Sequence, residues 1–147
     1  LGLQRERDGR DAEAQRLFAE ASRLDPKAYP PPMHVGPDAF RHVVDAEIAR
    51  LPEHERARLG EVKLEVQDVP ALDDLAAGVP VLSPTIVGLY RPDPAAIAPP
   101  TIVIYRKNML RLARTPAELS AEVRKTLLHE LGHHDGEDDA ALRDRGL

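Results

Sequence analysis

The sequence has no cysteine and no tryptophan, and aromatic residues are only 3% of its 147 positions. Without cysteine, disulfides, thiolate metal sites and cysteine nucleophiles are excluded, so a transition-metal site must use His, Asp or Glu. With so few aromatic residues, Leu, Val, Ile and Ala must fill the core. Apolar residues still make up 42% of the chain, which is enough for one compact domain with a short appended element.

An excess of positive charge and a long apolar run are also lacking. Lys and Arg number 20 against 25 Asp and Glu, for a formal net charge of −5. Such a chain has no general attraction for nucleic acid or for an anionic membrane surface, and no stretch is apolar for long enough to cross a bilayer. By default we expect a cytoplasmic protein without nucleic-acid or membrane partners. The sequence begins with Leu1 rather than Met, so we also expect a native N-terminal region to precede it.

Residues 1–29 have the spacing of a helical hairpin. Gly9 interrupts the first helical pattern and Pro26 ends the second. The segment resembles a partial tetratricopeptide repeat in the order of its small and large packing positions, which are Gly2, Gly9, Ala14, Phe18, Ala21 and Pro26. One such repeat cannot bury its own face, so the resemblance implies neighbouring repeats and a possible protein partner at this end. An ordinary hairpin docked on the main domain is the alternative.

Residues 30–36 include three consecutive prolines, Pro30–Pro32, which favour a stiff, extended linker. From residue 37 onward, hydrophobic periodicity and turn residues predict both helices and strands. Helices are expected at 37–51, 52–59, 72–77 and 115–134, and strands at 61–67, 85–90 and 101–105. The β-branched run Thr101–Tyr105 is the strongest strand signal. We expect it to be an exposed edge that can pair with a peptide.

The last long helix carries the run His129-Glu130-Leu131-Gly132-His133, the pattern HExxH. The two histidines are one turn apart, so both imidazoles project from the same face and can each lie about 2.0–2.1 Å from one Zn²⁺. Glu130 is rotated by about 100° around the helix, which suits a general base better than a third ligand. The pattern therefore predicts metal-assisted hydrolysis, with His129 and His133 as ligands and Glu130 as the base.

Two histidines alone do not hold zinc tightly, so a third protein ligand is needed. The run that begins at the first histidine fits HExxHxxGxxD, in which Gly136 turns the chain back and Asp139 falls at the third ligand position. Glu137 and Asp138 remain alternative ligands, and Asp138 or Asp139 is also a candidate N-cap for a final short helix. The expected metal ligands are therefore His129, His133 and Asp139.

From about Phe40 to the C-terminus, the chain resembles the small bacterial zincin-like metallopeptidase family. The resemblance is carried by Gly136, Asp139 and three stretches, which are Thr101–Tyr105, Arg106–Leu110 and Val123–His134. It implies an α+β fold, with a minimal zincin-like domain at 37–147 whose small mixed sheet packs on the active-site helix. It also implies Zn²⁺ as the cofactor and a peptide or protein as the substrate. Asp135 departs from the family pattern, where an aromatic residue is common.

Three functions are compatible with these patterns. The first is a zinc metallopeptidase, which Glu130 favours because a purely structural metal site needs no carboxylate beside its first histidine. The second is a non-catalytic binding module in which the metal is structural and the repeat-like N-terminus recognises a partner. The third is a metal-dependent ribonuclease with a similar histidine run. Glu130 and the acidic charge of the chain disfavour this last alternative.

Overall fold

The structure is a computed structural model that describes residues 1–78 and 80–147. These residues form two compact units, Leu1–Met33 and His34–Leu147. The boundary between the units falls within the predicted linker at 30–36, and the two units are described separately below. Among the described helices, none is both long enough and apolar enough to cross a membrane.

The N-terminal unit contains the predicted hairpin, formed by α1 (Gly2–Arg7) and α2 (Asp11–Leu24). Gly9 turns the chain between them with a φ of +72°, a conformation that favours glycine. A Cβ atom on Gly2 would lie only 2.5 Å from the Phe18 ring, so the two helices meet where one residue has no side chain. The helices agree with the expected hairpin, while the resemblance to a tetratricopeptide repeat stays a prediction.

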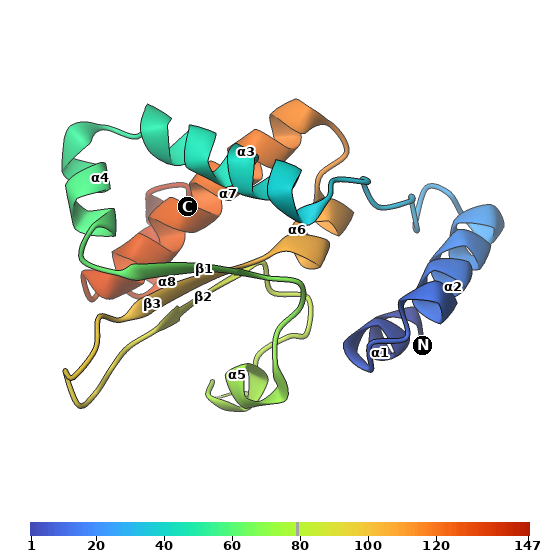
Figure 1. Cartoon of the computed structure of the whole chain (residues 1–147), viewed down its shortest axis with the longest axis horizontal. Coiled ribbons are helices and arrows are strands. Elements are labelled where there is room, and N and C mark those ends of the chain that lie inside the picture. The colour runs from blue at the N-terminus through green and yellow to red at the C-terminus, as the bar shows by residue number, and fades with distance from the viewer. Residues whose placement is uncertain (79) are drawn as a thin grey trace. The chain divides into compact units, whose positions relative to one another are not determined.

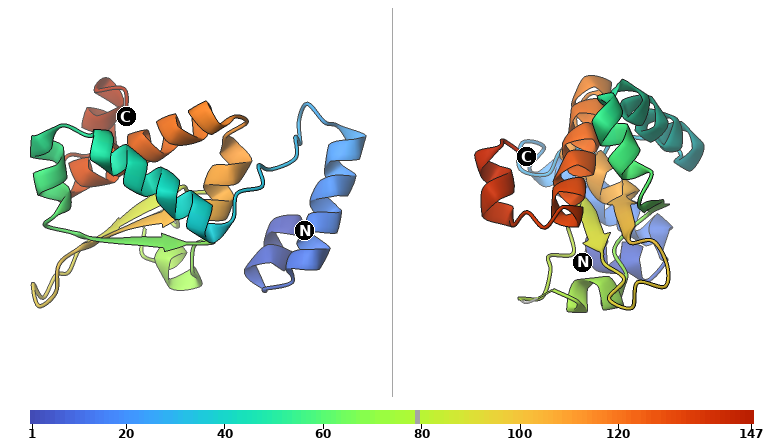
Figure 2. Two further views of the ribbon diagram at one scale, coloured as in Figure 1. Left: turned by 45° about the horizontal axis from the view of Figure 1, so that its top comes forward. Right: turned by 90° about the vertical axis from the view of Figure 1, so that its left-hand side faces the viewer.

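The C-terminal unit is an α+β domain with a small mixed sheet, as predicted. Helices α3 and α7 lie over one face of the sheet and the short helix α5 lies at the other face (Figures 1 and 2). Its elements are α3 (Pro37–Arg50), α4 (Glu53–Leu59), β1 (Lys63–Gln67), α5 (Leu72–Ala76), β2 (Gly88–Arg91), β3 (Thr101–Tyr105), α6 (Arg106–Leu112), α7 (Pro116–His134) and α8 (Asp139–Asp144).

The three strands are ordered β1-β3-β2, with β1 parallel and β2 antiparallel to β3. The expectation that Thr101–Tyr105 is an exposed edge is therefore wrong, because this strand is central and pairs on both sides. Its residues Ile102–Tyr105 are fully buried. A continuous apolar run is typical of a strand covered on both faces. A strand with one solvent-exposed face instead alternates apolar and polar residues. The edge strand that contacts α7 is β2.

Helix α6 was not predicted, because no helix was expected between the strand at 101–105 and the helix at 115–134. The structure begins a helix at Arg106 and buries three of its residues, which are Asn108, Met109 and Leu110. The Asn108 side-chain amide donates to the carbonyl oxygens of Pro84 (3.0 Å) and Ile86 (2.6 Å). This short helix thereby holds the segment that leads into β2.

Helix α7 forms as expected and provides the main contact of the sheet with the helical layer. The Thr115 hydroxyl accepts a hydrogen bond from the Glu118 backbone N–H (3.1 Å), and Pro116 occupies the first turn. At the other end, Gly136 has a φ of +85°. Four apolar side chains at intervals of four residues are buried, which are Leu119, Val123, Leu127 and Leu131. The burial of each side chain stabilises the fold by about 1.5–3 kcal/mol. Because this face of α7 packs in the core, the opposite face of the helix is left outside it.

Candidate metal centre

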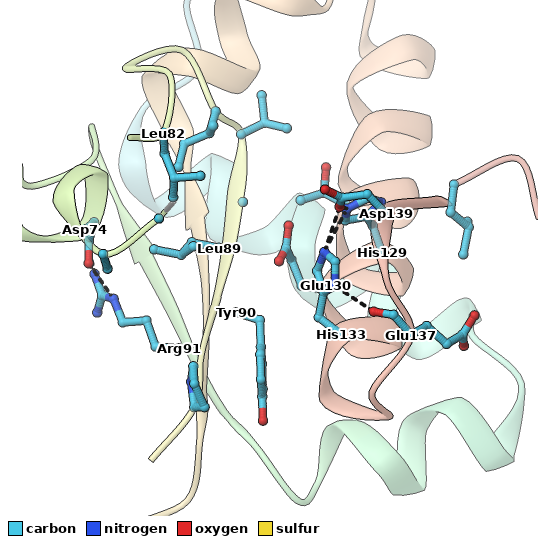
Figure 3. Close-up of a pocket in the computed structure, with 18 of the residues that line it drawn as sticks. Asp74, Leu82, Leu89, Tyr90, Arg91, His129, Glu130, His133, Glu137 and Asp139 are labelled. Carbon is cyan, nitrogen blue, oxygen red and sulfur yellow. Dashed lines mark hydrogen bonds and ion pairs between the residues drawn. The ribbon is translucent and has the colours of Figure 1, made fainter. Parts of the chain in front are cut away.

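Three side chains from α7 and α8 converge on one point. The Nε2 atoms of His129 and His133 are 3.1 Å apart, and Asp139 Oδ1 lies 3.5 Å from the first and 3.3 Å from the second (Figure 3). A tetrahedral zinc ion at about 2.0–2.1 Å from each ligand requires ligand atoms about 3.3–3.4 Å apart. The three atoms therefore have the spacing and the nitrogen and oxygen chemistry of a zinc site. The expected residues His129, His133 and Asp139 do come together.

Both histidines use a second contact to hold their rings. His133 Nδ1 lies 2.9 Å from the Glu137 carbonyl oxygen, so Nδ1–H donates and Nε2 keeps its lone pair for a metal. The backbone of Leu147 accepts a hydrogen bond from His129. Burial, together with the nearby charge of His133, lowers the pKa of His129 below its usual value. The neutral imidazole is thus favoured, and that is the form which binds metal.

The position of α8 explains which acidic residue faces the histidines. The Asp138 carboxylate accepts a hydrogen bond from the Ala141 backbone N–H (2.8 Å) and so caps α8. The Glu137 side chain pairs with Arg145. Asp139, the first residue of α8, is left with a carboxylate that is 70% exposed and points at the two imidazoles. Of the three acidic candidates in the sequence, the structure places Asp139 at the centre and engages the other two elsewhere.

The Glu130 side chain extends from α7 toward the edge of β2, and only 7% of the residue's surface is exposed. Burial raises the pKa of its carboxyl group to about 7, while the charge of His133 and a hydrogen bond from the Tyr90 backbone N–H act in the opposite direction. The carboxyl group also lines the same cleft as the histidines. A group whose pKa lies near neutrality can both accept and release a proton under physiological conditions.

Gly88, in β2, is a site residue that the sequence reasoning did not single out. A Cβ atom here would lie 2.4 Å from Thr126 Cγ2 and 2.9 Å from Glu130 Oε1, so α7 packs directly on the bare backbone. The signal was present in the sequence, because an isolated glycine in a strand pattern often marks the close approach of another group. It was missed because the partner, Glu130, is far away along the chain.

His134 follows His133 but turns away from the candidate metal position. Its Nδ1 atom lies 3.2 Å from the Tyr90 hydroxyl, and its Nε2 atom lies 3.3 Å from a carboxylate oxygen of Glu61. The rings of Tyr90 and His134 also contact each other at a tilted angle. His134 therefore ties the end of α7 to β2, which fixes the distance between the two walls of the cleft.

The metal position opens into a cleft of about 1200 Å³ that runs along β2. Ligand pockets for small molecules usually measure about 300–1,000 Å³. A cleft of this size, open along a strand, has room for an extended chain segment. Its lining residues include Leu82, Leu89, Tyr90, Glu130 and the two histidines (Figure 3).

Comparison with known proteins agrees with this geometry. A family model described as zincin-like metallopeptidase matches residues 59–147, which is more than half of the chain and includes the sheet, α7 and α8. No curated protein sequence matches the chain.

Proposed function

This chain belongs to the zincin-like metallopeptidase family, and from that premise we propose that it hydrolyses peptide bonds with zinc held by His129, His133 and Asp139. Glu130 is the general base of this reaction. The observation that carries the proposal is the triangle of ligand atoms, 3.1–3.5 Å on a side, beside a buried carboxylate at a strand edge. A structural metal site would have no use for that carboxylate.

Zinc bound at this position supplies a Lewis acid that polarises the substrate carbonyl and lowers the pKa of a water to about 7. The protein supplies the proton transfer. Glu130 accepts the proton of the attacking water and then donates it to the leaving amine, which needs a pKa near neutrality. The Tyr90 N–H holds the carboxylate toward the cleft, and the packing of Gly88 against it excludes bulk water.

The outer edge of β2, where the Tyr90 N–H already donates to Glu130, provides a place for the substrate backbone. The Tyr105 N–H donates to the Val87 carbonyl oxygen (2.9 Å), so these two residues form a hydrogen-bonded pair. Such pairs recur at every second residue of an antiparallel ladder, so the backbone N–H and C=O of Leu89 also point toward β3. The backbone groups of Gly88 and Tyr90 then point to the outer edge, next to Glu130. A peptide that adds to this edge as another strand places its backbone beside the metal position.

The test combines metal content with hydrolysis of a mixed peptide library. Wild type and Glu130→Gln should each contain about one zinc per chain by elemental analysis, because Glu130 is not a ligand. Hydrolysis by Glu130→Gln should fall by about 10²–10⁴-fold, the usual contribution of general acid–base catalysis. Asp139→Ala and His133→Ala should lose zinc. Glu53→Gln, at an exposed position in α4, serves as the matched control and should keep both zinc and activity.

Unchanged turnover in Glu130→Gln would remove Glu130 from the mechanism. A wild-type protein that binds zinc but cleaves no peptide would favour the alternative of a metal-stabilised binding module. Cleavage of RNA rather than peptide would favour the ribonuclease alternative, and an RNA substrate is therefore included in the assay.

A further inference from the structure

The edge strand β2 divides the cleft into two sides. Tyr90 points toward α7 and the metal position, whereas Leu89 and Arg91 point toward α5 (Figure 3). This alternation is the normal consequence of the pleat of a strand. The cleft is continuous around the strand edge, since one cavity is lined both by the two histidines and by residues of the α5 side.

On the α5 side the cleft forms an apolar recess, defined here by Ala77, Leu82 and Leu89. All three residues line the cavity, and Leu82 and Leu89 are half-buried. The Leu82 backbone N–H donates to the Leu75 carbonyl oxygen (2.9 Å), which ties this residue to α5. The Leu82 side chain lies over Gly78, where a Cβ atom would come within 2.6 Å of it.

Two of the charges that border the apolar recess, Arg91 and Asp74, neutralise each other, while the exposed Asp73 also lines this side of the cleft. Arg91 donates two hydrogen bonds to the Asp74 carboxylate, at 2.7 and 2.5 Å, and the Tyr105 hydroxyl donates a third at 2.9 Å. Asp74 is 8% exposed. This cluster holds α5 against the sheet and leaves neither charge available to a ligand. An acidic side chain that entered the recess would lose water without gaining a partner and would meet the Asp73 carboxylate at the border.

We infer that the apolar recess is a specificity subsite that takes an apolar side chain of an extended peptide substrate. The inference rests on the proposed peptidase function. In a peptide added to the outer edge of β2, successive side chains point to opposite faces. When the reacting residue lies on the α7 side with the metal, a neighbouring residue therefore points into the recess formed by Leu82 and Leu89.

The test is a set of fluorogenic peptides that differ at one position at a time, cleaved by the zinc-loaded protein. At one position beside the scissile bond, wild type should prefer Leu, Ile or Phe over Asp by about 10-fold or more in kcat/KM, the discrimination that apolar pockets achieve. Leu82→Lys should lose this preference and should accept Asp or Glu at the same position. Leu82→Ala should weaken the preference without adding a charge.

Leu72→Lys is the matched control, because Leu72 is also in α5 but is 71% exposed and does not line the cleft. It should keep the wild-type preference. Zinc content near one per chain and measurable cleavage of peptides with Gly at the tested position show that each variant is folded and active. Cleavage without an apolar preference, or a preference that survives in Leu82→Lys, overturns the subsite and leaves the peptidase proposal standing. A wild type that cleaves no peptide overturns both.

Discussion

At the scale of single residues, the geometry of the site depends on one missing side chain. Gly88 allows the backbone of β2 to lie against α7, with Glu130 Oε1 2.9 Å and Thr126 Cγ2 2.4 Å from where a Cβ atom would be. Real Cβ atoms do not approach other heavy atoms so closely. Any side chain at position 88 must therefore push Glu130, Thr126 or the strand itself out of place.

We accordingly expect Gly88→Ala to retain zinc but lose about 10²-fold in kcat/KM, because a displacement near 1 Å of a reacting group has an effect of this size. The measurement is peptide hydrolysis together with zinc content by elemental analysis. Gly36→Ala is the matched control, since Gly36 has a φ of −65° and nothing lies within 4 Å of its added Cβ. Equal activity in Gly88→Ala would show that the contact with Glu130 is unimportant.

At the scale of secondary-structure elements, the metal site depends on how α8 docks against α7. Gly132, inside α7, lets the Leu142 side chain of α8 approach so closely that a Cβ atom would lie 2.3 Å from Leu142 Cδ2. Leu142 is fully buried, and its helix begins with Asp139. The docking of α8 therefore sets the distance from Asp139 to the two histidines.

Gly132→Ala should raise the helix propensity of α7 by about 1 kcal/mol and yet weaken zinc binding by about 10–100-fold, as is usual when the support of a ligand is disturbed. The zinc dissociation constant is measured by competition with a chelator. Ser120→Ala, a similar small change elsewhere in α7, should leave it unchanged. If Gly132→Ala bound zinc as tightly as wild type, α8 would be free to adjust and the docking would not set the ligand distance.

At the scale of the whole domain, an ion cluster around one buried carboxylate ties the two long helices together. The Glu47 carboxylate, 1% exposed, accepts hydrogen bonds from Arg124 of α7 (2.8 and 3.0 Å) and from Arg50 of α3 (2.6 Å). Burial alone would raise the pKa of Glu47, but the hydrogen bonds and charges of the two arginines outweigh it and lower the pKa below 4.5. The folded state thus favours the ionised carboxylate.

Because the pKa of Glu47 is lower in the folded than in the unfolded chain, its contribution to stability is present above pH 4.5 and is lost as pH falls through the folded-state pKa. Glu47→Gln should therefore lower the free energy of unfolding by about 2 kcal/mol at pH 7, and the difference from wild type should shrink as the pH falls below 4.5. Urea unfolding across this pH range measures it. Asp45→Asn, exposed on the same helix, should change little. A difference that stayed constant with pH would contradict the lowered pKa.

The parts of the fold that were predicted from the sequence depend on local signals. Helix α7 has its N-cap, its proline and its glycine terminator within the same stretch of chain, so its bounds were evident. The strands were recognised, but β2 was expected at 85–90 and lies at Gly88–Arg91. The order of the strands was misjudged, because pairing joins residues distant in the chain and no local pattern records it. Helix α6 was missed although six of its seven residues are good helix formers, because it is short and follows directly on the strand signal of Thr101–Tyr105.

The sequence by itself determined the chemistry of the candidate site. The spacing of His129 and His133 along one helix, with Glu130 between them and Gly136 after them, limits what these residues can do in any fold that keeps the helix. Tertiary structure decided which of the three acidic side chains lies beside the two histidines, which strand edge borders the cleft and what lines its far side. Those choices depend on how α8, β2 and α5 pack, and packing is set by contacts between segments far apart in the chain.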